Sequence, residues 1–163
     1  MRCFWIALIC PLVLALSAFA QQASAGNDSS TTCTFDDGHE ITIRFATAGK
    51  RQEPQNGVWE PNGSPMFLFT QAPVTLGSTQ IPAGAYRLYL SGKKEWALIV
   101  SRNTKPDAAY DQEMDLGRSA MESEELVHPQ KPIHIELVHP QAKECGLRIF
   151  YGEKGYFAYF REP

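Results

Sequence analysis

The sequence has little of what marks a nucleic-acid-binding protein or a familiar class of enzyme. Its 15 Lys and Arg residues are outnumbered by 18 Asp and Glu residues, so the formal net charge is -3. A chain without a basic surplus has no electrostatic means of holding a phosphate backbone, which excludes nucleic acid as a partner. The Gly-x-Ser-x-Gly, His-Glu-x-x-His and phosphate-loop motifs are also absent. We therefore predict no catalytic residues and no cofactor.

A long apolar run occurs only at the N-terminus. A cationic start is followed by apolar residues from Phe4 to Leu16 and by the small-x-small sequence at 18–20, which is the layout of a secretory signal peptide. Pro11 interrupts this run, which falls short of the roughly 20 apolar residues that a membrane-spanning helix needs. We predict that residues 1–20 are a cleaved signal peptide, with Ala25 as the alternative cleavage point. The mature protein is then exported, to the periplasm or out of the cell, without a membrane attachment.

The four cysteines are too few for a disulfide-dense scaffold. Cys3 and Cys10 leave with the signal peptide, whereas Cys33 and Cys145 stay in a compartment where disulfides persist. We predict one disulfide between Cys33 and Cys145, and two buried free thiols are the alternative. The bridge would close a loop of more than 100 residues, for which the chain-entropy model gives roughly 4 to 5 kcal/mol of stabilisation.

Apolar stripes of helical period do not extend beyond two turns, and the body of the chain alternates as β-strands do. In residues 40–45, for example, every second side chain is apolar. The aromatic residues of the last two predicted strands, 147–151 and 156–160, are expected to fill the centre of the core. Turn-forming residues predict hairpins at 36–38, 91–94 and 152–155.

About seven short strands, with at most one short helix within 108–126, indicate an all-β fold. We predict an antiparallel β-sandwich or a jelly-roll-like barrel that spans residues 33–163. Residues 21–32 are polar and without periodicity, so we predict a flexible leader before this domain.

Several pieces of the sequence carry a family resemblance. Residues 74–77, the Pro-Ala-Gly-x-Tyr-x-Leu stretch at 82–88 and Glu95-Trp96 follow one another at short intervals. Together with 38–43 and 110–118, they resemble a family of exported bacterial proteins known as domain of unknown function 2911, over roughly residues 33–160. The resemblance implies an exported β-sandwich and brings no established activity with it.

One departure from the family pattern concerns the residue after Trp59. Family members usually show a Trp-Arg-x-Gly-Ala-Asn pattern there, whereas this chain has Glu60 in place of the Arg. We therefore carry over the position of Trp59 and nothing else from this stretch.

Trp59, Asn62, Tyr89 and Trp96 are the candidate ligand-binding residues. Small-molecule sites combine aromatic surface with a few polar groups, and Trp59 and Asn62 both belong to the loop at 56–65. A binding module predicts an exposed aromatic platform beside this loop. The alternative is that the three aromatic residues are ordinary core side chains.

No metal site is predicted, although one calcium candidate is present. Asp111, Glu113, Asp115 and Glu122 occupy positions 1, 3, 5 and 12 of a calcium-loop frame, but Leu116 stands where that loop needs Gly. Three histidines, His128, His134 and His139, are the candidate zinc ligands. Their spacings do not match those of common zinc sites, so we predict that they are surface histidines.

The sequence as a whole predicts an exported, monomeric, non-catalytic β-sandwich protein. Its expected partner is a small molecule such as a carbohydrate, or a component of the cell envelope, for which it would act as a binding or structural module. The alternative function is that of a small secreted hydrolase with an acid/His site that no motif reveals.

Overall fold

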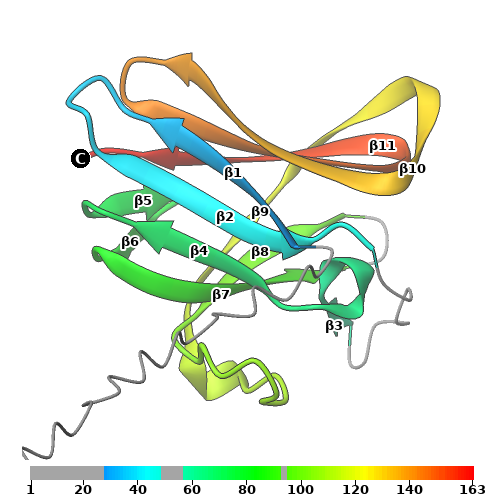
Figure 1. Ribbon diagram of the computed structural model, residues 1–163, viewed down its shortest axis with the longest axis horizontal. Helices are drawn as coiled ribbons and strands as arrows, with labels where there is room; N and C mark the ends of the chain where they lie inside the picture. The colour runs from blue at the N-terminus through cyan, green and yellow to red at the C-terminus, as the bar shows by residue number, and fades with distance from the viewer. Residues whose placement is uncertain (1–27, 49–56, 93–94) are drawn as a thin grey trace, which may run out of the picture.

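Two antiparallel β-sheets make up the computed structural model, which describes residues 28–48, 57–92 and 95–163 (Figure 1). The large sheet has the order β1-β2-β4-β7-β8-β9, with β3 paired to β7, and the small sheet has the order β10-β11-β5-β6. The predicted signal peptide, 1–20, lies outside the described residues. The strands are β1 (Asp28–Thr34), β2 (Glu40–Ala46), β3 (Val58–Trp59), β4 (Met66–Thr70), β5 (Val74–Leu76), β6 (Thr79–Ile81), β7 (Gly84–Ser91), β8 (Ala97–Ser101), β9 (Asp115–Ala120), β10 (Glu122–Gln141) and β11 (Glu144–Arg161).

The core lies between the two sheets because the inward side chains of the strands are apolar. Ile41 and Ile43 on β2 are completely buried, whereas Arg44 beside them is exposed. Leu88 on β7 and Phe160 on β11 bring completely buried side chains from opposite sheets. Burial of each such side chain contributes about 1.5 to 3 kcal/mol. The predicted antiparallel β-sandwich is confirmed, and the helical content of the described residues is limited to η1 (Pro61–Gly63) and η2 (Gln112–Met114).

The number of strands and the start of the domain differ from the prediction. The described residues form eleven strands rather than about seven, and β10 and β11 are 20 and 18 residues long. Residues 28–32, which we assigned to the flexible leader, belong to β1, whose whole length pairs with β2. β1 is an edge strand with small polar side chains before Cys33, so its order comes from backbone pairing that composition does not reveal.

Two of the predicted hairpins join neighbouring strands of the large sheet. β1 pairs with β2, and the turn between them is closed by the N–H of Gly38, which donates to the Phe35 carbonyl at 3.0 Å. Gly38 has a φ of 89°, a conformation that only glycine adopts at no cost. β7 pairs with β8 as predicted, although residues 93–94 of its turn lie outside the described residues.

β10 and β11 form a long two-stranded ribbon that bends sharply. Its pairing register shifts around Pro129 and Pro132, which have no N–H to donate to the partner strand. β11 bends so far that its two halves come close together. A Cβ added to Gly146 would lie only 3.4 Å from the ring of Tyr159, thirteen positions later. The hairpin predicted at 152–155 is wrong: these residues lie inside β11, and the segments on either side of them pair with β10 rather than with each other.

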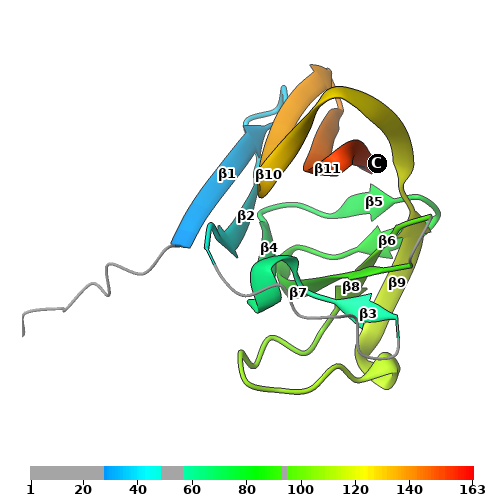
Figure 2. The same cartoon turned by 90° about the vertical axis from the view of Figure 1, so that its right-hand side faces the viewer.

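The two sheets are joined along one edge by the predicted disulfide. Cys33 on β1 is bonded to Cys145 on β11, with Cα atoms 6.0 Å apart. Close by, the backbone N–H of Leu137 on β10 donates to the Thr31 hydroxyl on β1 at 2.9 Å. β6 and β9 are in contact at the opposite edge. The sandwich is thus closed on both sides, with β1 and β10 adjacent in both views (Figures 1 and 2).

Candidate functional site

Two of the four predicted binding residues, Trp59 and Trp96, are in contact. Their rings meet edge to face with centroids 4.8 Å apart, and the Trp96 ring stacks on Tyr156 of β11 at 3.6 Å. Trp96 is 6% exposed, and Trp59 is half-buried against the same core. Trp96 therefore links the large sheet to β11 and presents little ring surface to a ligand.

The other two predicted residues lie elsewhere. Asn62 is in η1, where its side-chain N–H donates to the Ala46 carbonyl at 2.8 Å. Tyr89 is 3% exposed and lies between the core residues Leu88 and Leu90 on β7, so its ring points to the outer face of the large sheet. The four residues do not converge on one site.

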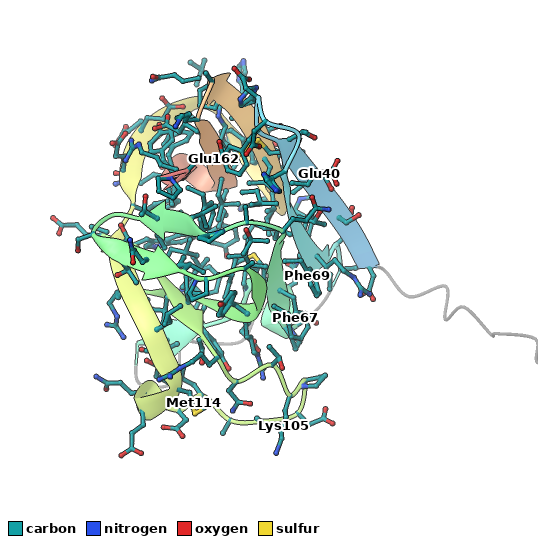
Figure 3. All side chains as sticks on the ribbon, turned by 90° about the vertical axis from the view of Figure 1, so that its left-hand side faces the viewer. Glu40, Phe67, Phe69, Lys105, Met114 and Glu162 are labelled. Carbon is teal, nitrogen blue, oxygen red and sulfur yellow. A yellow bond between two sulfur atoms is a disulfide. The ribbon has the colours of Figure 1, made fainter. Side chains whose placement is uncertain are left out.

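The outer face of the large sheet carries a buried polar cluster beneath the loop at 102–114. This outer polar cluster consists of Glu60, Arg87, Tyr89, Tyr110 and Asp115. Figure 2 shows the loop below β7 and β8, and Figure 3 labels Lys105 and Met114 within it.

Arg87 is the centre of this cluster and is 3% exposed. Its Nε donates to Glu60 Oε1 at 2.6 Å, and its Nη1 donates to the carbonyl oxygens of Lys105 at 2.6 Å and Ala108 at 3.1 Å. A buried guanidinium needs such compensation for its charge. The residue that departs from the family pattern, Glu60, is therefore the counter-ion that holds Arg87 and, through it, the covering loop.

The far side of the cluster is formed by Tyr110 and Asp115. The Tyr110 hydroxyl donates to Asp115 Oδ2 at 2.6 Å, and its ring packs on Tyr89 with centroids 5.0 Å apart. Burial raises the pKa of the Asp115 carboxyl and also that of the Tyr89 hydroxyl. Asp115 Oδ1 and the Tyr89 hydroxyl are buried without a hydrogen-bond partner among the described residues. The loop covers Arg87 and Tyr89 and leaves the other members partly buried, so the role of the cluster is to hold the loop in place.

The four acids of the calcium frame are not gathered into a loop. Asp111 Oδ1 accepts the Glu113 N–H at 3.0 Å and so caps η2, while Asp115 belongs to the outer polar cluster. The extended strand β9 separates Asp111 from Glu122, which begins β10. Within the described residues, the side chains that lie close enough to share a metal ion are found elsewhere, at Asp37, His39 and Glu162.

The outer face of the small sheet has a hollow of about 270 Å³, which we call the ribbon groove. Its residues come from two parts of the ribbon that are brought together by the bend, and Glu122 pairs with Phe157 across the strands. The lining side chains are Glu122, Ser123 and Glu124 of β10, and Arg148, Phe157 and Tyr159 of β11.

Strand alternation and glycine positions create the groove. Phe157 and Tyr159 are half-exposed and alternate with the buried residues Ala158 and Phe160, so their rings point outward. A Cβ on Gly155 would lie 2.9 Å from the Phe157 ring, so this glycine leaves room for the ring beside the backbone. We predicted that the aromatic residues of the last two strands fill the core. This prediction is wrong for the aromatic residues that face outward, such as Phe157 and Tyr159.

Charges of both signs surround Tyr159. Burial raises the pKa of its hydroxyl, the Glu122 carboxylate raises it further and the Arg148 guanidinium lowers it. The Arg161 guanidinium lies 5.7 Å from the centre of the Tyr159 ring. Arg148 is also 3.7 Å from Glu136, which restrains its guanidinium at the edge of the groove. The groove therefore offers an aromatic surface flanked by hydrogen-bond donors and acceptors.

A second hollow, of about 240 Å³, lies over β5 and β6. It is lined mainly by apolar side chains, including three prolines, and has no charged side chain. It provides less of the polar chemistry that fixes the orientation of a ligand.

Comparison with known proteins gives one match. No curated protein matches the chain, and no solved structure matches it. In the described residues, no helix is long and apolar enough to cross a membrane. The model of a protein family described as a protein of unknown function (DUF2911) matches residues 48–156, which is more than half of the chain. This match confirms the resemblance seen in the sequence, and the chain belongs to the DUF2911 family.

Proposed function

We propose that the protein is an exported, non-catalytic binding module that holds a small carbohydrate in the ribbon groove. The observation that carries this proposal is the combination of two outward-facing rings, Phe157 and Tyr159, with two carboxylates, a hydroxyl and a guanidinium in one hollow. All six side chains stand on β-strands, which hold a binding surface more firmly than loops do.

The chemistry of a sugar fits this set of groups. One face of a pyranose ring is lined by C–H groups that pack on an aromatic ring, while its hydroxyls both donate and accept hydrogen bonds. Glu122 and Glu124 supply acceptors, Arg148 supplies donors and Ser123 supplies both. A hollow of about 270 Å³ lies just below the usual range for drug-sized ligands, which favours a ligand of one or two rings.

Export is supported by two independent features. The N-terminal sequence has the layout of a signal peptide, and the Cys33–Cys145 disulfide is of the kind that persists in oxidising compartments. A binding module in the envelope or outside the cell would meet free and polymeric sugars there.

Isothermal titration of the mature protein with a panel of neutral and amino hexoses tests the proposal. We expect one panel member to bind, and Tyr159→Ala to weaken that binding about fivefold, since a ring contact is worth on the order of 1 kcal/mol. Phe67→Ala is the matched control, because Phe67 is a half-exposed ring on β4 of the other sheet (Figure 3). Absence of binding across the panel, or equal losses in the two variants, would contradict the proposal.

A further inference from the structure

Three metal-ligating side chains converge at the end of the sandwich that holds the disulfide. Asp37 and His39 lie in the turn between β1 and β2, and Glu162 follows the last residue of β11. Each offers one ligand atom, and these atoms all lie within 4.8 Å of one another. Figure 3 views the molecule from this end, with Glu162 near Glu40 at the start of β2.

The backbone around these side chains is firmly held. The turn is closed by the Phe35 N–H, which donates to the His39 carbonyl at 2.9 Å, and Phe35 itself is buried. On the other side, the Glu162 N–H donates to the Lys143 carbonyl at 3.0 Å. The Cys33–Cys145 disulfide lies two residues from Phe35 and two from Lys143. The three ligating side chains are thus presented by segments that are cross-linked to each other.

Two acids and one imidazole make up the cluster. Asp37 and Glu162 are two acids in close proximity, and the proximity of Asp37 adds to the effect of burial in raising the pKa of Glu162. His39 Nδ1 is 2.6 Å from Asp37 Oδ2, and this hydrogen bond raises the pKa of the imidazole above its ordinary value. The Lys143 ammonium, whose charge lowers the pKa of Glu162, is hydrogen-bonded to the Pro163 carbonyl at 3.2 Å.

A second histidine lies near the cluster but does not belong to it. His139 Nε2 lies 3.5 Å from Asp36 on the adjacent part of the turn, so it is directed toward that acid instead. Two carboxyl groups and one imidazole therefore face each other, with their ligand atoms within 4.8 Å. A divalent ion would replace the hydrogen bond between His39 and Asp37 with two coordination bonds.

We propose that Asp37, His39 and Glu162 bind one divalent transition-metal ion, with zinc as the best-suited member of the class. Imidazole nitrogen combined with carboxylate oxygen suits zinc and its first-row neighbours better than calcium or magnesium, which prefer oxygen alone. Zinc–ligand distances of roughly 2.0 to 2.2 Å place two ligand atoms of a four-coordinate ion about 3.4 Å apart. His39 Nδ1 and Asp37 Oδ2, at 2.6 Å, would therefore move slightly apart, whereas pairs of ligand atoms near 4.8 Å would move closer together. Three protein ligands leave at least one position of a four-coordinate ion open to water or another ligand. The site shares no residue with the ribbon groove, so either proposal can fail without the other.

Titration of the tag-free mature protein with zinc chloride, followed by calorimetry, tests this site. We expect one ion per chain, and at least a tenfold weaker affinity in His39→Gln and in Glu162→Gln. His134→Gln is the matched control, since His134 is an exposed histidine near Glu136 on β10, and its affinity should equal that of the wild type. Cobalt(II) offers a second readout, because its visible absorption should appear in the wild type and in the control but not in His39→Gln. Absence of zinc binding, or binding that survives both substitutions, would overturn the proposal.

Discussion

Replacing both bridged cysteines, Cys33→Ala with Cys145→Ala, is expected to remove a large part of the stability of the domain. The bridge spans a sequence separation of 112 residues, for which loop-closure entropy gives about 4.8 kcal/mol of stabilisation. Single domains are stable by only about 5 to 15 kcal/mol. Alanine is the appropriate replacement because Cys33 is 4% and Cys145 0% exposed, and serine would bury two hydroxyls that need partners.

Urea unfolding followed by circular dichroism measures this loss. With a denaturant slope of about 2 kcal/mol per M, the midpoint of the double variant should fall by about 2 M. Reduction of the wild type should produce a similar fall, whereas the double variant should not respond to the reductant. A midpoint within about 0.5 M of the oxidised wild type would refute the reasoning, because it would mean that the bridge constrains the unfolded chain very little.

Further predictions concern the outer polar cluster and the core. Glu60→Ala should lower the free energy of unfolding by about 3 to 5 kcal/mol in urea titrations, because it leaves the buried charge of Arg87 uncompensated; a loss below 1 kcal/mol would show that the pair is solvated. The pKa of Asp115 is raised by burial above its ordinary value of 3.8, and an acid with a raised pKa in the folded state loses stability as the pH rises. Asp115→Asn should therefore gain stability relative to the wild type as the pH rises from 3.8 to neutrality, and a parallel pH profile would contradict this. Trp96→Ala should cost about 3 to 5 kcal/mol while leaving the sugar affinity of the folded fraction unchanged, whereas a lost affinity at unchanged stability would place the ligand at Trp96.

The fold could be predicted from the sequence wherever apolar and polar residues alternate. The alternation in β2 and the turn at Gly38 are both present as predicted. β1 escaped prediction because its side chains are small and polar, and its place in the sheet depends on pairing with β2. The length of β10 and β11 was also missed, since glycines and prolines that normally end strands sit here in the bend of the ribbon.

The candidate sites were harder to predict because they depend on contacts between distant residues. The ribbon groove joins Glu122 to Tyr159, and the proposed metal site joins His39 to Glu162. A signal for the groove was available in the alternation of outward rings with inward residues at 156–160, but the aromatic content was attributed to the core as a whole. No comparable signal exists for the metal site, because its ligands belong to segments that meet only through the packing of the two sheets.

The outer polar cluster was not predicted from the sequence, although two of its members lie in stretches compared with the family. Arg87 lies inside the Pro-Ala-Gly-x-Tyr-x-Leu stretch, and Glu60 is the residue that departs from the family pattern. The structure makes them partners at 2.6 Å. The residue that departs from the family pattern thus forms an ion pair with the buried Arg87.

The most direct test of the account is to map a bound sugar by NMR on the mature protein. Two-dimensional amide spectra recorded with the hexose that binds best should show shifts concentrated at residues 122–124, 148 and 157–159, which line the ribbon groove. Shifts centred on Trp59, Asn62 and Trp96, or on residues 73–82 beside the apolar hollow, would contradict the assignment of the groove as the binding site.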